Sequence, residues 1–360
     1  MCFFTAANVH EFRLLLKEIL CLFAIDFLYM KKADILIITL LFFVISCNDS
    51  TKNKAKTITK DEPITIAAPS FDRDSAFYFV KTQTSFGPRV PNTEAHKKCA
   101  QFLQTQLKNY CDRVIVQSFV THTYDGTKIN GKNIIGSFFP EKEKRILLAA
   151  HWDSRPFADN DPNPANRDKP IDGANDGASG VGILLEIARQ LKEKNPAVGI
   201  DIVFFDVEDW GPRNSQNVEG DWWCLGSQYW AKNQHAINYK AEYGILLDMV
   251  GAPNAKFMQE WHSMHYASRI VSKVWAKAYQ LGYKDYFLNI GSNPVTDDHV
   301  YVSKIAKIPM INIIHQDNST ETGFNPTWHT LHDNISNIDK HTLYVVGTTV
   351  LAVLYEEGKY

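Results

Sequence analysis

Four short apolar runs in this chain each end in side chains that bind metals or transfer protons. The side chains that follow the runs are His151 with Asp153, the segment 206–209, Asp248 and His315. Continuous apolar stretches of this length are typical of strands buried on both faces of a largely parallel sheet. The carboxyl ends of such strands lie along one edge, where ligands of open α/β sheets bind. The pattern indicates the metal site of a hydrolase or transferase at that edge.

Two further motifs offer metal ligands. Asp176 lies on a glycine-rich turn, residues 171–180, just before a helical segment. A helix cap is the simpler explanation for an Asp there, and no Gly-Lys-Ser/Thr closes the turn as in a phosphate-binding loop. His329 follows the large aromatic Trp328, an arrangement suited to a metal ligand that lines a pocket. Neither motif decides the matter alone.

Glu208 and Asp209 are adjacent carboxylates at a strand end, and they cannot both point the same way. One of them can ligate a metal while its neighbour faces a substrate as a general base. The alternative is that both lie in a solvated loop.

The elements that must position these residues follow from hydrophobic period and turn residues. We expect helices over 72–84, 94–110, 179–192, 261–281 and 339–356, and a hairpin-like edge of strands over 113–123 and 133–139. Residues 153–176 contain several prolines and no apolar run, which predicts a long surface loop. Helices that alternate with buried strands predict an α/β domain with a central, mostly parallel sheet.

The N-terminal part has the layout of a bacterial lipoprotein signal. Met30 and two lysines precede the apolar run 35–45, and the sequence Val44-Ile45-Ser46-Cys47 resembles a lipobox. We therefore expect a lipidated Cys47 that anchors the mature protein to the membrane, at the periplasmic side of the cell envelope or the cell surface. The alternatives are an uncleaved anchor or a buried helix.

This layout divides the chain into four parts. Translation is expected to start at Met30, so residues 1–29 have no assigned role. Residues 30–46 form the signal peptide. Residues 47–68, rich in Lys, Thr, Ser and Asn, form a flexible tether. Residues 69–360 form one catalytic domain, because no repeat or second change of composition divides them.

Charge and cysteine usage exclude some partners and bonds. The formal net charge is -2 and there is no basic block, which argues against nucleic acid as a partner. Cys99 and Cys111 would lie ~18 Å apart along a helix, whereas disulfide-linked Cα atoms lie about 4.4 to 6.8 Å apart. We expect buried free thiols, with Cys224 in a loop near the acidic cluster.

Together the motifs resemble a known family. Their order and spacing are similar to those of the zinc aminopeptidase-like family M28, over about residues 70–356. More narrowly, three of them resemble the animal-type glutaminyl cyclases and their bacterial relatives. The segments that carry the resemblance are 151–153, 173–176, 205–209, 246–254, 297–299 and 328–334. The resemblance implies a three-layer α/β domain whose central mixed sheet is flanked by helices.

The resemblance also implies a ligand set. Asp176, Asp209 and His329 would hold one Zn²⁺ per chain and leave a fourth position open. The family usually has Glu where this chain has Asp209, whose carboxylate is shorter by about one methylene. A non-proline cis peptide would follow the bridging Asp, which places it at Asp176-Gly177.

The remaining roles are also implied by the resemblance. Glu208 would be the proton shuttle, beside an acid network of Asp248 and Asp297. Where the animal enzymes have a further His, this chain has Asn312. The walls of the substrate pocket would be Trp328, Phe324 and one of Trp222 or Trp223.

These roles predict a glutaminyl-peptide cyclotransferase, which converts the N-terminal Gln of peptides and proteins to pyroglutamate and releases ammonia. The first alternative is a dinuclear aminopeptidase, because His151 and Asp248 could join the three ligands to hold two zinc ions. The bulky Trp328 argues against it, since a large ring suits a small pocket. The second alternative is a non-catalytic binding ectodomain on the same fold.

Overall fold

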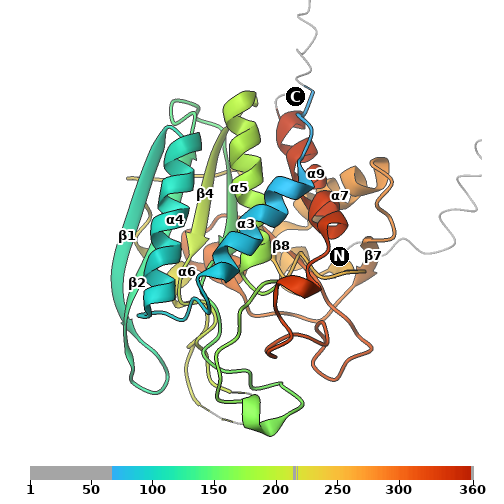
Figure 1. Ribbon diagram of the computed structural model, residues 1–360. Helices are drawn as coiled ribbons and strands as arrows, with labels where there is room; N and C mark the ends of the chain where they lie inside the picture. The colour runs from blue at the N-terminus through green and yellow to red at the C-terminus, as the bar shows by residue number, and fades with distance from the viewer. Residues whose placement is uncertain (1–66, 214–215, 217, 358–360) are drawn as a thin grey trace, which may run out of the picture. The chain divides into compact units, whose positions relative to one another are not determined.

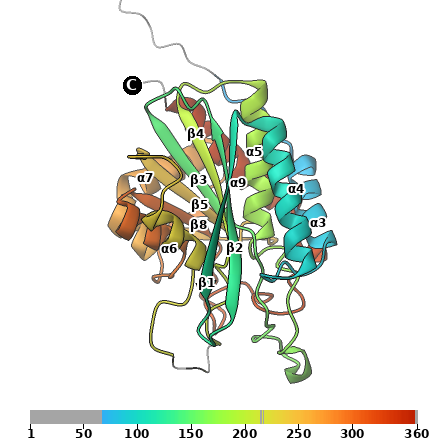
Figure 2. The same cartoon turned by 90° about the vertical axis from the view of Figure 1, so that its left-hand side faces the viewer.

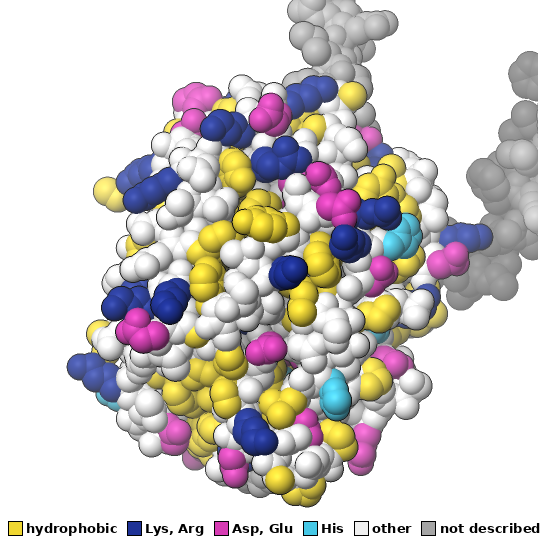
Figure 3. All heavy atoms as spheres, viewed as in Figure 1, with side chains coloured by type: hydrophobic (Ala, Val, Ile, Leu, Met, Phe, Trp, Pro, Cys, Tyr) yellow, Lys and Arg dark blue, Asp and Glu magenta, His cyan; other side chains and the backbone are white. Residues whose placement is uncertain are grey.

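The computed structural model describes residues 67–213, 216 and 218–357. The expected start, the signal peptide, the lipidation site at Cys47 and nearly all of the tether lie outside these residues. None of the helices within them is long and apolar enough to span a membrane. On the face shown in Figure 3, basic and acidic side chains are interspersed, as the near-neutral composition predicts.

The central sheet has six strands in the order β1-β2-β4-β3-β5-β8. The four strands β4, β3, β5 and β8 are parallel, and β1 and β2 form an antiparallel edge. This arrangement confirms the predicted mixed, mostly parallel sheet, which Figure 2 shows nearly edge-on. The bounds are β1 Arg113–His122, β2 Lys128–Phe138, β3 Arg145–His151, β4 Gly199–Phe205, β5 Tyr243–Asp248 and β8 Met310–Ile314.

Helices cover both faces of the sheet and form the outer layers (Figure 2). One face carries α3, α4, α5 and α9, and the other carries α6, α8 and the π-helical turn Val302–Ala306; α7 packs against β8 and α9. Neighbouring residues of β3 pack on opposite faces of the sheet. Leu148 lies in the hydrophobic core beneath α3, α4, α5 and α9, and Leu147 lies in the core on the side of α6. The bounds are α3 Arg73–Ser85, α4 Glu94–Tyr110, α5 Ala178–Glu193, α6 Leu225–Lys232, α7 Trp261–Gln280, α8 Asp298–Tyr301 and α9 Lys340–Glu356.

The parallel strands end in register at one edge. His151 at the end of β3 pairs with Phe205 at the end of β4, and Asp248 at the end of β5 pairs with Ile314 of β8. All seven residues of β4 are buried, which is why its sequence is a continuous apolar run. The loops that leave this edge gather at the lower end of the sheet in Figure 1. A small two-stranded sheet, β6 Phe257–Gln259 with β7 Phe287–Gly291, lies outside the main one.

Two expectations about local structure need correction. The second edge strand begins at Lys128 rather than at residue 133. The segment 153–176 is not a surface loop at its beginning, because Asp153 and Arg155 are fully buried. It includes the short 3-10 helix Pro164–Asn166. Polar residues can lie in the interior here because they form hydrogen bonds and ion pairs with one another and with the backbone.

The three described cysteines carry free thiols. Cys99 and Cys224 are buried as expected, whereas Cys111 at the end of α4 is half-buried. Cys224 lies at the end of a loop, as expected, directly before α6.

Candidate active site

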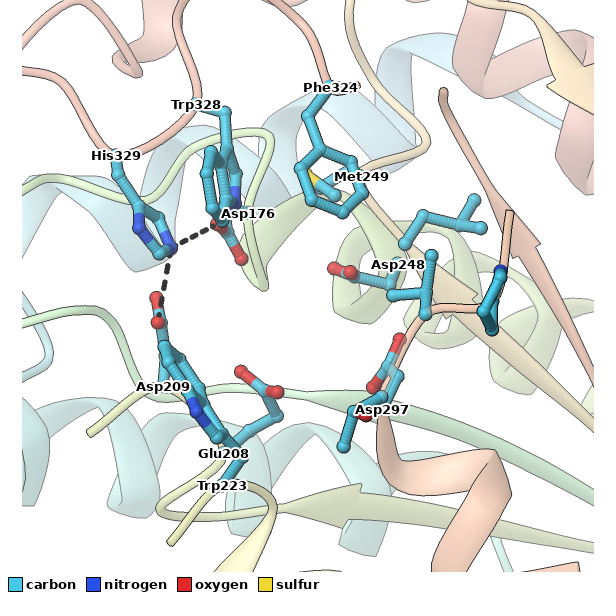
Figure 4. A pocket seen from close by; sticks show the side chains of 14 residues that line it. Asp176, Glu208, Asp209, Trp223, Asp248, Met249, Asp297, Phe324, Trp328 and His329 are labelled. Atoms are coloured by element: carbon cyan, nitrogen blue, oxygen red, sulfur yellow. Dashed lines mark ion pairs between the residues drawn. The ribbon is translucent and has the colours of Figure 1, made fainter. Parts of the chain in front are cut away.

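The predicted site residues meet in one cavity of about 260 Å³ at the carboxyl edge of the sheet. Its floor is acidic and its walls are mostly aromatic and aliphatic (Figure 4). It is lined by Asp176, Glu208, Asp209, Trp223, Asp248, Met249, Pro294, Val295, Thr296, Asp297, Ile314, Phe324, Trp328 and His329. Segments from the ends of three strands and from several loops far apart in the sequence are therefore brought together.

Asp176, Asp209 and His329 form a compact cluster of possible ligands. All three are buried, and one ligand atom from each lies within 4.8 Å of the others. His329 Nε2 lies 3.3 Å from Asp209 Oδ1 and 3.7 Å from Asp176 Oδ2 (Figure 4). Asp209 Oδ2 is buried without a hydrogen-bond partner. Two buried carboxylates and an imidazole with an unsatisfied oxygen suit Zn²⁺, which takes O and N ligands at a tetrahedral site.

Arg155 and Asp159 support this cluster from behind. Asp159 Oδ1 lies 3.3 Å from His329 Nδ1 and so faces the ring nitrogen that is not directed at the other ligands. Arg155 donates to both oxygens of Asp159, at 2.8 and 2.7 Å, and to the backbone oxygen of Asp209 at 3.2 Å. A carboxylate behind a ligating imidazole fixes its tautomer and orientation. Sequence reasoning missed both residues.

Asp333 holds the turn that carries Asp176. Its two carboxylate oxygens accept the backbone N–H groups of Asn175, at 2.7 Å, and Asp176, at 3.0 Å. The expected cis peptide at Asp176-Gly177 is wrong, because the described residues contain no cis peptide. The two hydrogen bonds to Asp333 and the positive φ of Gly177, +93°, close the turn with a trans peptide bond between Asp176 and Gly177. A Cβ at position 177 would lie 2.9 Å from Asp153 O, which requires glycine.

Glu208 and Asp209 diverge as the sequence predicts. Their backbone N–H groups donate to the two oxygens of buried Asp153, both at 3.1 Å. Asp209 then faces His329, while Glu208 projects into the cavity between Asp209 and Asp297 (Figure 4). Burial raises the pKa of Glu208 well above its usual value, and the charges of Asp209 and Asp297 raise it further against the opposing effect of His151. The raised pKa favours the protonated form of this carboxyl group.

Asp248 and Asp297 lie across the cavity from the ligand cluster (Figure 4). Asp248 Oδ1 is 3.2 Å from His151 Nε2, which also lies 3.0 Å from Asp176 Oδ1. Burial raises the pKa of Asp248 to about 7. Asn312 donates to Asp297 Oδ2 at 2.6 Å. Among the described residues no hydrogen bond joins the two acids directly, so the expected acid network consists of two branches, one through His151 and one through Asn312.

Three aromatic rings form the wall that the sequence predicts. Trp328 stacks on the His329 ring with centroids 3.7 Å apart, and Phe324 packs 4.6 Å from Trp328. Trp223 lines the cavity, nearly parallel to the His329 ring at 6.4 Å. Trp222 does not line it, since its indole N–H donates to the backbone oxygen of Glu219 at 2.9 Å. Of the two candidate tryptophans, Trp223 is therefore the one that forms part of the cavity wall, and Trp222 is not.

Comparison with known proteins agrees with this geometry. The model of peptidase family M28 matches residues 133–354. The chain belongs to peptidase family M28.

Several relatives of this M28 chain carry the name of a single reaction. The crystal structure of Tannerella forsythia glutaminyl cyclase is 54% identical, with a TM-score of 0.78, and the match covers 80% of this chain and 99% of that one. A glutaminyl-peptide cyclotransferase of Drosophila melanogaster is 24% identical over 282 residues, 71% of this chain and 73% of the relative. The crystal structure of a Zn-dependent exopeptidase from Parabacteroides distasonis is 53% identical, with a TM-score of 0.79. The match covers 80% of this chain and 99% of the exopeptidase chain.

Two polar residues that follow the strands do not join the site of this M28 chain. The Asp206 carboxylate accepts from His96 Nε2, at 2.9 and 3.0 Å, on the other side of the sheet end. His315 is buried but does not line the cavity. The expectation that all four strand ends contribute to one volume therefore holds for Glu208, Asp209 and Asp248, which line the cavity, while His151 contacts Asp176 and Asp248 without lining it.

Left-handed backbone conformations gather around the site of this M28 chain. The φ angles are 56° at Val207, 58° at Cys224, 50° at Met249 and 54° at His329. Residues with a Cβ rarely adopt such angles, and a β-branched residue is a clear outlier. Strained positions of this kind are typical of functional sites. They cannot be recognised in the sequence, because none of the four is glycine.

Proposed function

We propose that this chain is a glutaminyl-peptide cyclotransferase, which converts the N-terminal glutamine of peptides and proteins to pyroglutamate with release of ammonia. One observation carries the proposal: a buried ligand cluster and a separate carboxyl group, Glu208, whose pKa is raised by burial, share a single small cavity. The 54% identity to a bacterial glutaminyl cyclase supports the same reaction.

The proposed cofactor is one Zn²⁺ per chain, held by Asp176, Asp209 and His329. When bound there, zinc supplies a Lewis acid for the side-chain carbonyl of the substrate glutamine. His329 is aligned for ligation by Asp159, and Arg155 keeps Asp159 and Asp209 in place. The shorter side chain of Asp209, compared with the Glu usual in the family, still reaches to 3.3 Å from His329 Nε2.

Glu208 moves the proton in the proposed reaction. The α-amine of the substrate attacks its own side-chain amide, so the amine must lose a proton and the departing ammonia must gain one. Glu208 performs both transfers, and a raised pKa suits a group that gains and loses a proton near neutral pH. Asp248 and Asp297 line the cavity beside it, where they can accept hydrogen bonds from the α-amine.

The walls supply proximity. Trp223, Phe324 and Trp328 narrow the cavity so that the glutamine side chain curls toward its own amine. Holding two reacting groups together in this way removes a large part of the entropic barrier.

A dinuclear aminopeptidase is the second candidate, because His151, Asp176 and Asp248 form another cluster of possible ligands and several relatives are named exopeptidases or aminopeptidases. Against it, although burial alone would lower the pKa of His151, the neighbouring carboxylates of Asp153, Asp176 and Asp248 raise it well above its usual value. This raised pKa favours the positively charged form of His151, whose Nε2 lies 3.0 Å from Asp176 and 3.2 Å from Asp248, and a positive ring there opposes a second cation.

One assay tests the proposal. The purified zinc-loaded protein is given a Gln-initiated peptide and, separately, a Leu-initiated peptide. We expect cyclisation of the first and no cleavage of the second. Cleavage of the Leu peptide, with two zinc ions per chain, would assign the chain to the aminopeptidases.

We also propose that the mature protein is lipid-anchored through Cys47 at the cell envelope of a bacterium. Support comes from the sequence: a basic start at Met30, the apolar run 35–45 and a lipobox-like ending. Replacement Cys47→Ala should abolish fatty-acid labelling of the expressed protein. Persistent labelling, or an unprocessed product in the cytosol, would contradict the proposal.

A further inference from the structure

The Glu208 carboxylate has a neighbour whose role the reaction does not yet explain. Cys224 Sγ lies 3.3 Å from Glu208 Oε1, within hydrogen-bond distance for sulfur. Cys224 is fully buried. In the part of the chain that the structure describes, its thiol is the one side-chain donor this close to the Glu208 carboxylate. The orientation of the proton shuttle therefore depends on a thiol.

The backbone fixes this contact from the other side. The N–H of Cys224 donates to the backbone oxygen of Glu208 at 3.0 Å, and the N–H of Leu225 donates to that of Val207 at 2.9 Å. Cys224 adopts φ 58° and ψ 36° directly before α6. Glycine is the residue best suited to this left-handed conformation, but glycine has no side chain that reaches Glu208. The two kinds of contact, backbone and side chain, hold residues 208 and 224 as one unit.

The chemical state of the thiol agrees with a donor. Burial raises the pKa of Cys224 well above its usual value, and the nearby carboxylates of Glu208, Asp298 and Asp297 raise it further. Glu208, Cys224 and Asp297 do form a third cluster of possible ligand atoms. Metal binding and nucleophilic attack both require a thiolate, however. A thiol that keeps its proton can donate a hydrogen bond to the Glu208 carboxyl oxygen 3.3 Å away.

We propose that Cys224 is a positioning residue for the cyclisation: its thiol donates to Oε1 of Glu208 and thereby makes Oε2 the oxygen that exchanges protons with the substrate. The oxygen atom that accepts the S–H hydrogen bond, Oε1, cannot also carry the shuttled proton on the side that faces Cys224. The contact also stops the carboxyl group from rotating about its last bond in a cavity with room for water. This inference rests on the proposed cyclotransferase function.

Kinetics of two replacements test the role. Cys224→Ala removes the donor, whereas Cys224→Ser keeps a hydroxyl donor of similar size. We expect Cys224→Ala to lower kcat roughly tenfold, the effect of one lost hydrogen bond, with KM and zinc content unchanged. Cys224→Ser should restore most of kcat. Cys99→Ala, at the other fully buried cysteine, is the matched control and should leave kcat unchanged. Unchanged turnover in Cys224→Ala, or equal losses in the Ala and Ser variants, would overturn the inference.

A spectroscopic measurement tests the contact without any turnover. The S–H stretching band of Cys224 is identified in the infrared spectrum as the band that Cys224→Ser removes. Glu208→Gln should shift this band, because a neutral amide oxygen replaces the carboxyl oxygen as acceptor. An unshifted band would overturn the inference even if the parent protein cyclises Gln peptides. A parent that does not cyclise them would contradict the proposed function, while the band would still decide whether the thiol donates to Glu208.

Discussion

The two halves of the cavity are built from the same kind of residue but have different electrostatic surroundings. The ligand half contains Asp176, Asp209 and His329, and Arg155 lies behind it. The shuttle half contains Glu208, Asp248 and Asp297, which line the cavity without an arginine or lysine in its lining. Both halves are buried, so burial by itself cannot distinguish them.

The neighbours set the pKa of each carboxylate. In the ligand half, burial and the charge of Asp176 raise the pKa of Asp209 against the effects of His329 and Arg155. Burial would raise the pKa of Asp176, but the hydrogen bond and charge of His151 and the charge of His329 outweigh it and lower that pKa. In the shuttle half, burial raises the pKa of Asp248 to about 7, because burial and the charges of Asp297 and Asp176 outweigh the hydrogen bond and charge of His151. An ionised carboxylate binds a cation and a protonated one transfers a proton. One cavity can therefore use carboxyl groups both to bind a cation and to transfer a proton.

The largest effect on kcat should follow from removing the exchangeable proton of Glu208. Glu208→Gln keeps the size of the side chain and removes only the exchangeable proton. We expect kcat for cyclisation to fall about a thousandfold while zinc content stays at one ion per chain. Steady-state kinetics on a Gln-initiated peptide and metal analysis of the same sample measure both.

Asp209→Ala is the matched variant in the ligand half, one residue away. It should lose zinc and activity together, because it removes one of the three ligands. If Glu208→Gln were instead the metal-free variant, the two halves would have been assigned the wrong way round.

The next effect should follow from loosening the support of the ligand half. Asp159→Asn removes the charge that faces His329 Nδ1 and weakens the contact with Arg155. We expect zinc affinity to fall about 10- to 100-fold, the usual cost of losing the carboxylate behind a ligating imidazole. Competition with a chelator measures the affinity.

Asp168→Asn provides the control for Asp159→Asn. Asp168 also pairs with an arginine, Arg213, at 2.8 Å, but its side chain is 87% exposed. Exposed ion pairs contribute little, so zinc affinity should not change. Equal affinities for the parent and Asp159→Asn would show that the ligand half holds His329 without this carboxylate.

Two imidazoles at strand ends extend the same comparison. His151 follows β3 among three carboxylates, which together raise its pKa well above the usual value against the effect of burial. His315 follows β8, and burial lowers its pKa to about 4. Its Nδ1 has no hydrogen-bond partner. Both rings are nearly inaccessible to solvent, so the difference again comes from the neighbours.

His315 should therefore make stability depend on pH. Between about pH 4 and 6.5 the unfolded chain binds a proton at this residue and the folded chain does not, so stability is lost as pH falls through that window. At pH 5 the cost is about 2 kcal/mol. His315→Phe keeps a ring and cannot titrate, so the loss of stability between about pH 7.5 and 5 should be smaller by about that amount. Urea unfolding of parent and variant at both values measures it, and parallel losses would contradict the pKa direction.

Much of the fold could be predicted from the sequence because burial on both faces leaves a compositional signal. The seven buried residues of β4 form a continuous apolar run, and α5 shows an apolar stripe between polar residues. The residue that follows such a run must lie at the carboxyl edge. This is why the order of residues along the chain is enough to place Glu208, Asp209 and Asp248 in the site.

The supporting residues could not be predicted, because their partners are distant in the sequence. Arg155 and Asp159 lie in a polar, proline-rich segment whose sequence resembles a surface loop. In the folded protein the beginning of this segment is buried by contacts with Asp209 and His329. Cys224 has no motif of its own. Val207 is left-handed although its side chain disfavours that conformation, so no local signal marks the turn that separates Glu208 from Asp209.

The sequence also could not choose between Trp222 and Trp223, and this pair gives the smallest and sharpest prediction. The Trp223 ring lies over Arg155, 4.8 Å from its guanidinium carbon, and faces the cavity, so it packs against the support of the ligand half. Trp223→Ala should lower kcat/KM for a Gln peptide about tenfold, equivalent to about 1.4 kcal/mol. Trp222→Ala removes an equally large ring that contacts Glu219 instead, and should leave kcat/KM within about twofold of the parent. Because the two variants lose the same atoms from adjacent positions, a general loss of stability would affect both. Equal kinetic losses would therefore mean that the wall beside the ligand half is not Trp223.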